Sequence, residues 1–186
     1  RPLEAGGAVS ATLVTGDLKL GAVGTVTYVD KDHMVAFGHP FLDKGSSAYF
    51  MHNSYIFTVV PSRNIPFKLG SVGAESGTVN EDRGSGISGL SGKVPESVRL
   101  HSSVLDEDTG RTQSLNVRMV QNERMLPMLS VTSVYNNMSN TLDRNGEGTV
   151  SLSYTLFPED LKKRPFTLSN LYWSSKDFSE RSVDEM

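Results

Sequence analysis

The chain contains no cysteine, and this absence excludes three kinds of chemistry. Disulfide bonds, thiolate metal sites and a cysteine nucleophile are all ruled out. The histidines show neither an HExxH motif nor a paired spacing; they are His33, His39, His52 and His101. We therefore expect neither a metal site nor a bound cofactor.

The chain also lacks an excess of positive charge and any long apolar run. Its formal charge of −3 argues against nucleic-acid binding and against a polybasic membrane surface. No apolar run approaches the ~20 residues that span a bilayer. Arg1-Pro2-Leu3-Glu4 does not begin a signal peptide, although export is still compatible with a processed chain. We expect no direct membrane insertion. The expected partners are a peptide or protein, or other domains of a parent protein.

The residues that are abundant indicate β structure. The 186 residues include 17 glycines, with frequent threonine, serine and valine. This length allows one good core or two small barrels packed together. The fold class expected is mainly β, with small β-barrels and one helix. Alternating or β-branched runs predict strands over residues 8–15, 18–29, 33–37, 55–60, 67–72, 97–105, 112–120 and 149–157.

Three other stretches complete the expected organisation. Residues 45–53 look like a loop, and residues 123–142 predict the helix, with Pro127 in its first turn and a methionine-bearing apolar stripe as core. The glycine- and serine-rich residues 70–92 fit either a disordered linker or tight turns, and the regularly placed Val72, Val79, Ile87 and Leu90 favour order.

The acidic turn 106–111 looks like a calcium loop but lacks the remaining oxygen ligands, which favours a solvated turn. We expect a barrel domain over residues 1–157 and a truncated extension over 158–186. Residues 177–186 have the pattern of a helix that begins and is then cut off, so we interpret the chain as a fragment of a longer protein.

The most informative stretch is Met34-Val35-Ala36-Phe37-Gly38-His39-Pro40-Phe41. Glycine allows a sharp turn after the apolar strand, and Pro40 restricts the backbone of His39. A histidine at such a strand end either satisfies a local hydrogen bond or serves as a working side chain.

These residues belong to a set of segments that resembles the SpoIVB peptidase family, serine peptidases of the chymotrypsin-like clan. The segments are Gly24 to Val29, Ala36 to Pro40, Pro66 to Gly70, and Asn80 to Arg83 followed by Gly86 to Gly89. The resemblance implies a chymotrypsin-like barrel, serine endopeptidase activity, and a bacterial, exported, extracytoplasmic protein. It places His39 at the general base, where a neutral imidazole takes a proton from a serine hydroxyl.

The chain departs from the family at the nucleophile, because the Gly-x-Ser-Gly-Ser-Pro motif is absent. The nearest substitutes are Gly89-Leu90-Ser91-Gly92 and Thr149-Val150-Ser151-Leu152-Ser153. The orienting acid is open between two candidates: Asp82 lies in a matched segment, whereas the family places its aspartate later, nearer to Asp143. Asp82 could instead cap backbone amides or pair with Arg83.

Three interpretations follow. The first is a fragment of a SpoIVB-like peptidase domain that contributes the general-base histidine His39, with Asp82 as its acid, and is inactive alone. The second is a non-catalytic β-barrel module for peptide binding or interdomain packing. The third is a small-molecule or sugar-binding module, with an aromatic-lined pocket near Tyr49, Phe50 and Tyr55.

Overall fold

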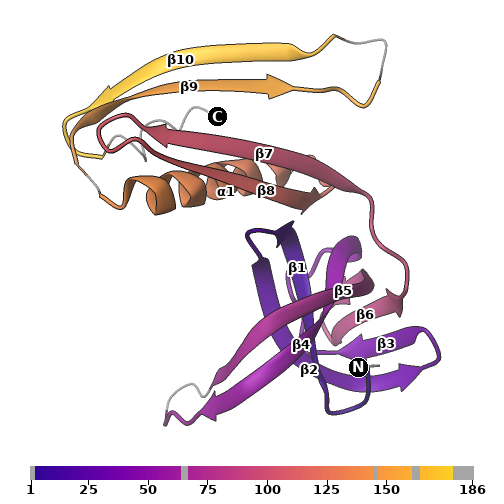
Figure 1. Cartoon of the computed structure of the whole chain (residues 1–186). Coiled ribbons are helices and arrows are strands. Elements are labelled where there is room, and N and C mark those ends of the chain that lie inside the picture. Colours follow the sequence, from indigo (N-terminus) through magenta and orange to yellow (C-terminus); the bar gives the residue numbers. More distant parts are fainter. Residues whose placement is uncertain (1–2, 64–66, 145, 161–163, 178–186) are drawn as a thin grey trace. The chain divides into compact units, whose positions relative to one another are not determined.

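The computed structural model describes residues 3–63, 67–144, 146–160 and 164–177 (Figure 1). Contacts divide the chain into two compact units. Unit 1 comprises residues 1–100 and 116–129, and unit 2 comprises residues 101–115 and 130–186. Each unit is described by itself.

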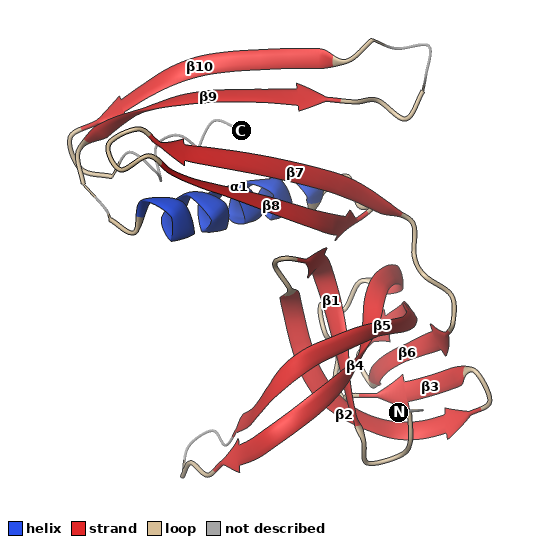
Figure 2. Ribbon diagram, viewed as in Figure 1, coloured by secondary structure: helices blue, strands red, loops and turns tan. Residues whose placement is uncertain are grey.

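Unit 1 is built on six antiparallel strands that form a closed ring. They are β1 (Ala8–Gly16), β2 (Leu20–Asp30), β3 (His33–Ala36), β4 (Gly45–Val60), β5 (Phe67–Arg83) and β6 (Gly86–Ser91). The order of pairing is β2-β3-β6-β5-β4-β1, and β1 returns to pair with β2. The expectation of a mainly β fold containing a barrel-like sheet is confirmed, as Figure 2 shows.

Fully buried aliphatic, methionine and aromatic side chains form the core of this unit. They lie on all six strands, and they include Val9, Val26, Met34, Met51, Val79 and Ile87. Such burial stabilises the ring, because each large apolar side chain removed from water contributes about 1.5–3 kcal/mol.

Two segments expected to be irregular form strands instead. Residues 45–53 belong to β4, where Tyr49, Phe50 and Met51 are consecutive buried residues. Residues 70–92 lie mostly in β5 and β6, so neither a linker nor a series of tight turns describes them. Glycine is required there for close packing: a Cβ on Gly77 would lie 2.0 Å from the Leu90 carbonyl oxygen.

Five further elements follow β6 in the described chain. The hairpin of β7 (Ser97–Asp106) and β8 (Arg111–Val120) was expected almost at these bounds. Residues 117–119 of β8 pair with β1 inside unit 1. Unit 2 also contains most of α1 (Leu126–Leu142) and a separate two-stranded sheet of β9 (Gly148–Leu156) and β10 (Phe166–Ser174).

The helix begins three residues later than the sequence predicts. Asn122 holds the preceding turn, because its Oδ1 accepts the backbone N–H groups of Arg124 at 3.1 Å and Met125 at 3.3 Å. Met138 of the predicted core stripe is buried, whereas Met128 is exposed. The helix is neither long nor apolar enough to cross a membrane, and no other helix occurs among the described residues.

The stretch 158–186, expected as an extension, contains β10, which pairs with β9 over its whole length from Phe166↔Leu156 to Ser174↔Gly148. The sequence predicts no strand there: apolar and polar residues alternate only from Phe166 to Ser169, and Leu171, Tyr172 and Trp173 follow one another after Asn170. The helix expected to start at Asp177 lies outside the described residues.

Candidate functional site

His39 lies in the loop that follows the short strand β3. That strand ends at Ala36, which is paired with Val26 of β2 and Ile87 of β6. The next two residues, Phe37 and Gly38, both have positive φ angles, 75° and 76°. This reverses the chain at the rim of the ring and leaves His39 exposed to solvent.

Phe37 anchors the start of this loop. Its backbone N–H donates to the Thr25 carbonyl at 2.9 Å. Its ring covers Gly24 so closely that a Cβ there would lie 2.2 Å from a ring carbon. The same ring contacts the rings of His39 and Phe41, with centroids 5.6 and 6.4 Å away. A glycine at position 24 therefore makes room for the aromatic support of His39.

The His39 ring has a defined hydrogen bond and therefore a defined tautomer. Its Nδ1 lies 2.8 Å from the Pro40 carbonyl oxygen. Because a carbonyl can only accept, Nδ1 carries the proton in this bond, and Nε2 of the neutral ring keeps its lone pair. This is the tautomer that a general base needs to take a proton from a hydroxyl group.

Asp82 supports the same loop but does not touch the imidazole. It is fully buried at the end of β5. Its Oδ1 accepts the Phe41 backbone N–H and its Oδ2 accepts the Leu42 N–H, each at 2.7 Å. Both carboxylate oxygens thus hold the backbone just after His39, and the structure does not place an Asp82–His39 hydrogen bond. Amide capping, rather than pairing with Arg83, is what the structure shows.

Tyr49 extends this support into the core. Its ring packs edge-on against Phe41, with centroids 5.8 Å apart. Burial, and after it the negative charge of Asp82, raise the pKa of the Tyr49 phenol to about 12. The phenol is therefore neutral at physiological pH and acts as part of the packing beneath the loop.

The serine-containing segments suggested by the sequence lie outside the loop of His39. Ser91 follows Leu90, which is paired with His33 at the opposite end of β3 from His39. The strand between these ends is about 10 Å long, at 3.3 Å per residue. Ser151 belongs to β9 in unit 2. Among the residues that the structure describes, no serine hydroxyl is hydrogen-bonded to the His39 ring.

Asp143, the other candidate acid, ends α1 in unit 2. It has a positive φ of 50°, and its N–H donates to the Ser139 carbonyl at 3.1 Å. This is the left-handed conformation that commonly terminates a helix. Termination of α1 is therefore sufficient to explain why an aspartate with positive φ stands at residue 143.

The three residues of the aromatic pocket considered from the sequence do not share one surface: Tyr49 and Phe50 are buried, whereas Tyr55 is exposed further along β4. Within the described ranges, no cluster of three or more histidine and acidic side chains could hold a metal ion.

Sequence reasoning missed the group that orients His39. The Pro40 carbonyl belongs to the backbone, so no residue type signals its role. No protein-family model, curated protein or solved structure matches this chain.

Proposed function

We propose that this chain is a SpoIVB-like serine peptidase domain that contributes the general-base histidine, His39, to an active site whose nucleophile lies outside the 186 residues. The substrate is a peptide or protein, and the setting is extracytoplasmic. The observation that carries the proposal is the 2.8 Å bond from Nδ1 to the Pro40 carbonyl in an exposed ring. That bond leaves Nε2 free to accept a proton.

The strand order supports the finer statement that the ring is a chymotrypsin-like barrel. Strands β4-β1-β2-β3 lie side by side in the ring, and this order is a Greek key. Serine peptidases of this class use β-barrels as their scaffold. The chain would supply the base half of the site, while a serine from another segment approaches the rim of the ring.

The reaction assigned to His39 follows the usual course of acyl transfer. Nε2 takes the proton of the serine hydroxyl as the oxygen attacks the peptide carbonyl, and then returns the proton to the leaving amine. The Pro40 carbonyl holds the ring in the required tautomer. Asp82 is a positioning residue in this scheme, because it acts on the Phe41 and Leu42 amides and not on the ring.

A fluorophosphonate probe tests the proposal in the protein expressed with the flanking residues that its gene encodes. We expect one labelled serine, in a segment outside these 186 residues, and loss of labelling in His39→Ala. His33→Ala is the matched control, because His33 is also exposed and belongs to the adjoining strand. Labelling that survives His39→Ala, or no labelled serine at all, would overturn the proposal.

The second candidate is a non-catalytic barrel module for peptide binding or interdomain packing. It is favoured by the absence, among described residues, of any carboxylate or hydroxyl hydrogen-bonded to His39. In that case substitution of His39 alters neither probe labelling nor hydrolysis, and the loop serves only to close the end of the ring.

A further inference from the structure

The distal parts of β4 and β5 form an arm to which no other described strand is paired. We define the arm as residues 54–60 and 67–72. Its pairs run from Ser54↔Val72 to Val60↔Phe67. Strand β1 pairs with β4 only up to Asn53, and β6 pairs with β5 only from Gly77 onward. Both edges of the arm are therefore unpaired within the described sheet.

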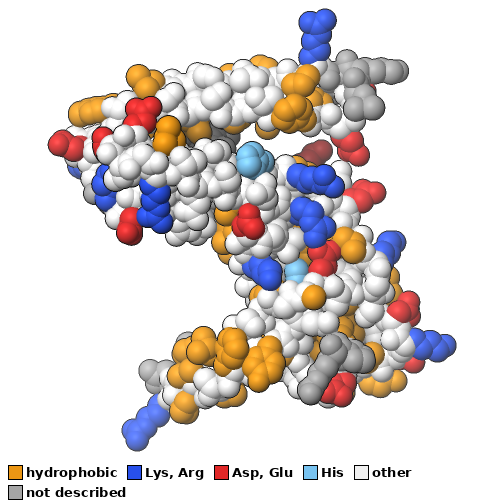
Figure 3. Space-filling view, viewed as in Figure 1, with side chains coloured by type: hydrophobic (Ala, Val, Ile, Leu, Met, Phe, Trp, Pro, Cys, Tyr) orange, Lys and Arg blue, Asp and Glu red, His pale blue; other side chains and the backbone are white. Residues whose placement is uncertain are grey.

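Large apolar side chains are concentrated on this arm. Five of them are between 51% and 66% exposed: Tyr55, Phe57, Val59, Phe67 and Leu69. The Tyr55 and Phe57 rings contact each other, with centroids 5.4 Å apart. Figure 3 shows hydrophobic side chains gathered over this part of the surface. Two-stranded hairpins are marginal in water, so an arm of this kind gains stability when its apolar groups are covered.

Most of these side chains share one face of the arm. Tyr55 is paired with Ser71, and directly paired side chains share a face. Residues 67, 69 and 71 alternate onto the same face of the strand, so Tyr55 lies on the face of Phe67 and Leu69. The Phe57 ring contacts the Tyr55 ring, whereas Val59 is paired with Lys68 on the opposite face. The arm therefore presents one aromatic and aliphatic face, which a lipid interface can cover as it covers the apolar face of other amphipathic elements.

The charge of the arm differs from that of the whole chain. Residues 53–74 contain no aspartate or glutamate but include Arg63 and Lys68, while the chain carries a formal charge of −3. Both basic residues are exposed, and Lys68 also donates to the Thr25 hydroxyl. At the base of the arm, Lys19 donates to the Val72 carbonyl at 2.9 Å. An anionic surface complements this arrangement.

We propose that the arm is a peripheral docking element for anionic lipid membranes. Its aromatic and aliphatic side chains enter the headgroup region, and Arg63 and Lys68 contact lipid phosphates. The unpaired backbone groups at both edges limit the insertion to the hydrated interface, because open sheet edges are not tolerated in the hydrocarbon core. The contact requires no spanning segment, and it does not depend on the peptidase proposal.

Vesicle flotation tests the docking element. The 186-residue protein should bind vesicles of phosphatidylcholine with phosphatidylglycerol, bind phosphatidylcholine alone much more weakly, and dissociate as salt is raised. The double variant Phe57→Ser/Phe67→Ser should weaken binding by about tenfold or more, from the lost apolar burial. Arg63→Glu/Lys68→Glu should weaken it by at least about fivefold for each basic residue lost.

A matched control comes from unit 2. Phe157→Ser/Phe166→Ser changes two exposed phenylalanines at the ends of β9 and β10 and should leave vesicle binding unchanged. The unfolding midpoint of each variant is measured, and vesicle binding is compared only among variants whose midpoints equal that of the native protein. Failure of the native protein to bind anionic vesicles overturns the proposal, as does an equal loss in arm and control variants. The proposal is also overturned if sedimentation shows a dimer of the native protein that Phe57→Ser/Phe67→Ser abolishes, while the native protein does not bind vesicles.

Discussion

A backbone carbonyl can do part of what the carboxylate does in a Ser-His-Asp triad. The Pro40 carbonyl accepts the Nδ1 proton of His39 and so selects the tautomer with a free Nε2. It carries no charge, and it therefore stabilises the imidazolium less than a carboxylate would. The orientation of His39 then depends on how firmly the backbone of residues 40–42 is held, which is the role of Asp82.

Asp82→Asn tests this positioning role. An asparagine amide has only one oxygen, so one of the two loop N–H groups loses its acceptor in a buried place. We expect the free energy of unfolding to fall by about 1.5–3 kcal/mol, the usual value of a hydrogen bond to a charged group. Urea unfolding measures this fall, and ¹⁵N spectra of the His39 ring should show a mixture of tautomers.

Asp43→Asn is the control for Asp82→Asn, because Asp43 is exposed in the same loop and asparagine tolerates its positive φ of 54°. Equal stabilities of Asp82→Asn and the native protein, with an unchanged His39 tautomer, would show that Asp82 does not position the ring.

His52 is a second histidine with a defined environment, and it is buried. Its Nδ1 donates to the Gly73 carbonyl at 3.1 Å, and its Nε2 has no partner among the described residues. Burial is the main reason that the pKa of His52 is lowered; the charges of Lys19 and Arg118 add to this, while the Gly73 bond and Glu75 oppose it. The ring is therefore neutral in the folded protein at neutral pH.

The lowered pKa predicts a pH-dependent stability. Between the folded and the unfolded pKa, which is near 6.5, the unfolded chain binds more protons than the folded one. The contribution is thus fully present above pH 6.5 and is lost as the pH falls toward the folded pKa. The slope from this one site is at most about 1.4 kcal/mol per pH unit.

Urea unfolding of His52→Gln from pH 8 to pH 5, compared with the native protein and with His33→Gln, measures this term. The native protein and His33→Gln should share the slope, and His52→Gln should reduce it. An identical slope in all three proteins would contradict the assignment to His52.

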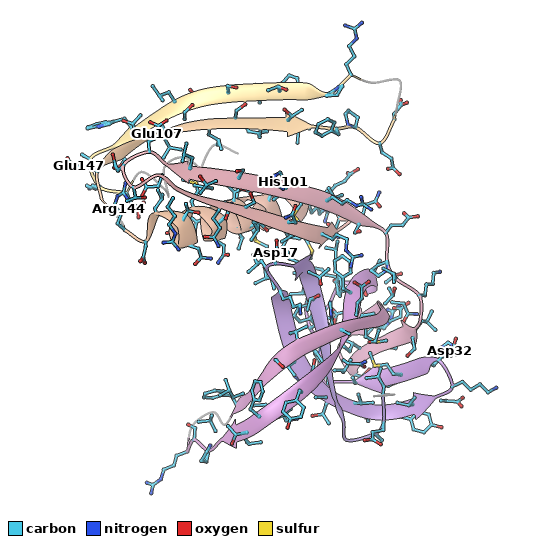
Figure 4. All side chains as sticks on the ribbon, in the orientation of Figure 1. Asp17, Asp32, His101, Glu107, Arg144 and Glu147 are labelled. Atoms are coloured by element: carbon cyan, nitrogen blue, oxygen red, sulfur yellow. The ribbon has the colours of Figure 1, made fainter. Side chains whose placement is uncertain are left out.

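At the scale of elements, one ion-pair network joins the tip of the β7–β8 hairpin to the end of α1. Arg144 donates to the two oxygens of Asp106 at 2.7 and 3.0 Å, and to Asp108 at 2.7 Å. Thr109 donates to Asp106 from the same turn at 2.7 Å. Figure 4 shows Arg144 at this end of unit 2, close to Glu107. The turn expected to be solvated is therefore organised around a buried Asp106.

Arg144→Gln should release this turn and lower the urea midpoint at neutral pH. Hydrogen bonds from Arg144, then from Thr109, hold the pKa of Asp106 well below its usual value of 3.8. The stabilisation is present above pH 4 and is lost as the pH falls below it, so the native protein and Arg144→Gln should converge in stability at acidic pH. Arg111→Gln, an exposed position in the same hairpin, should differ little from the native protein at any pH. Parallel pH profiles of all three proteins would contradict the network.

The elements that the sequence predicted well are those in which local pattern and burial agree. In the hairpin of β7 and β8, apolar and polar residues alternate at Val98–Leu100 and at Leu115–Met119, and the sequence predicts both strands almost at their true bounds. Strand β4 was missed at Gly45–Asn53, because both faces are buried at residues 49–52 and the alternation that marks a half-buried strand disappears. The glycines of β5 and β6 resemble turn residues, although Gly77 serves close packing between strands.

The candidate site was predictable only in part, for a similar reason. An exposed histidine after a short apolar strand follows from Ala36, Gly38 and Pro40. The role of Asp82 depends on a contact between its side chain and the Phe41 backbone N–H, 41 residues away in the chain. The role of the Pro40 carbonyl depends on the conformation of the loop itself. Neither leaves a signal in residue type or spacing.

At the scale of the whole molecule, the proposed peptidase site is divided, with its base in unit 1 and its nucleophile beyond the chain. The 186-residue protein should therefore neither hydrolyse peptides nor react rapidly with a fluorophosphonate at any serine. The physical reason is the separation of the parts. Ser91 follows Leu90 of β6, which is paired with the end of β3 remote from His39, and an unactivated hydroxyl is a poor nucleophile. Rapid labelling of one serine in this chain, lost in His39→Ala and retained in His33→Ala, would instead show a complete site within the chain and would require the Ser91 or Ser151 segment to reach the histidine.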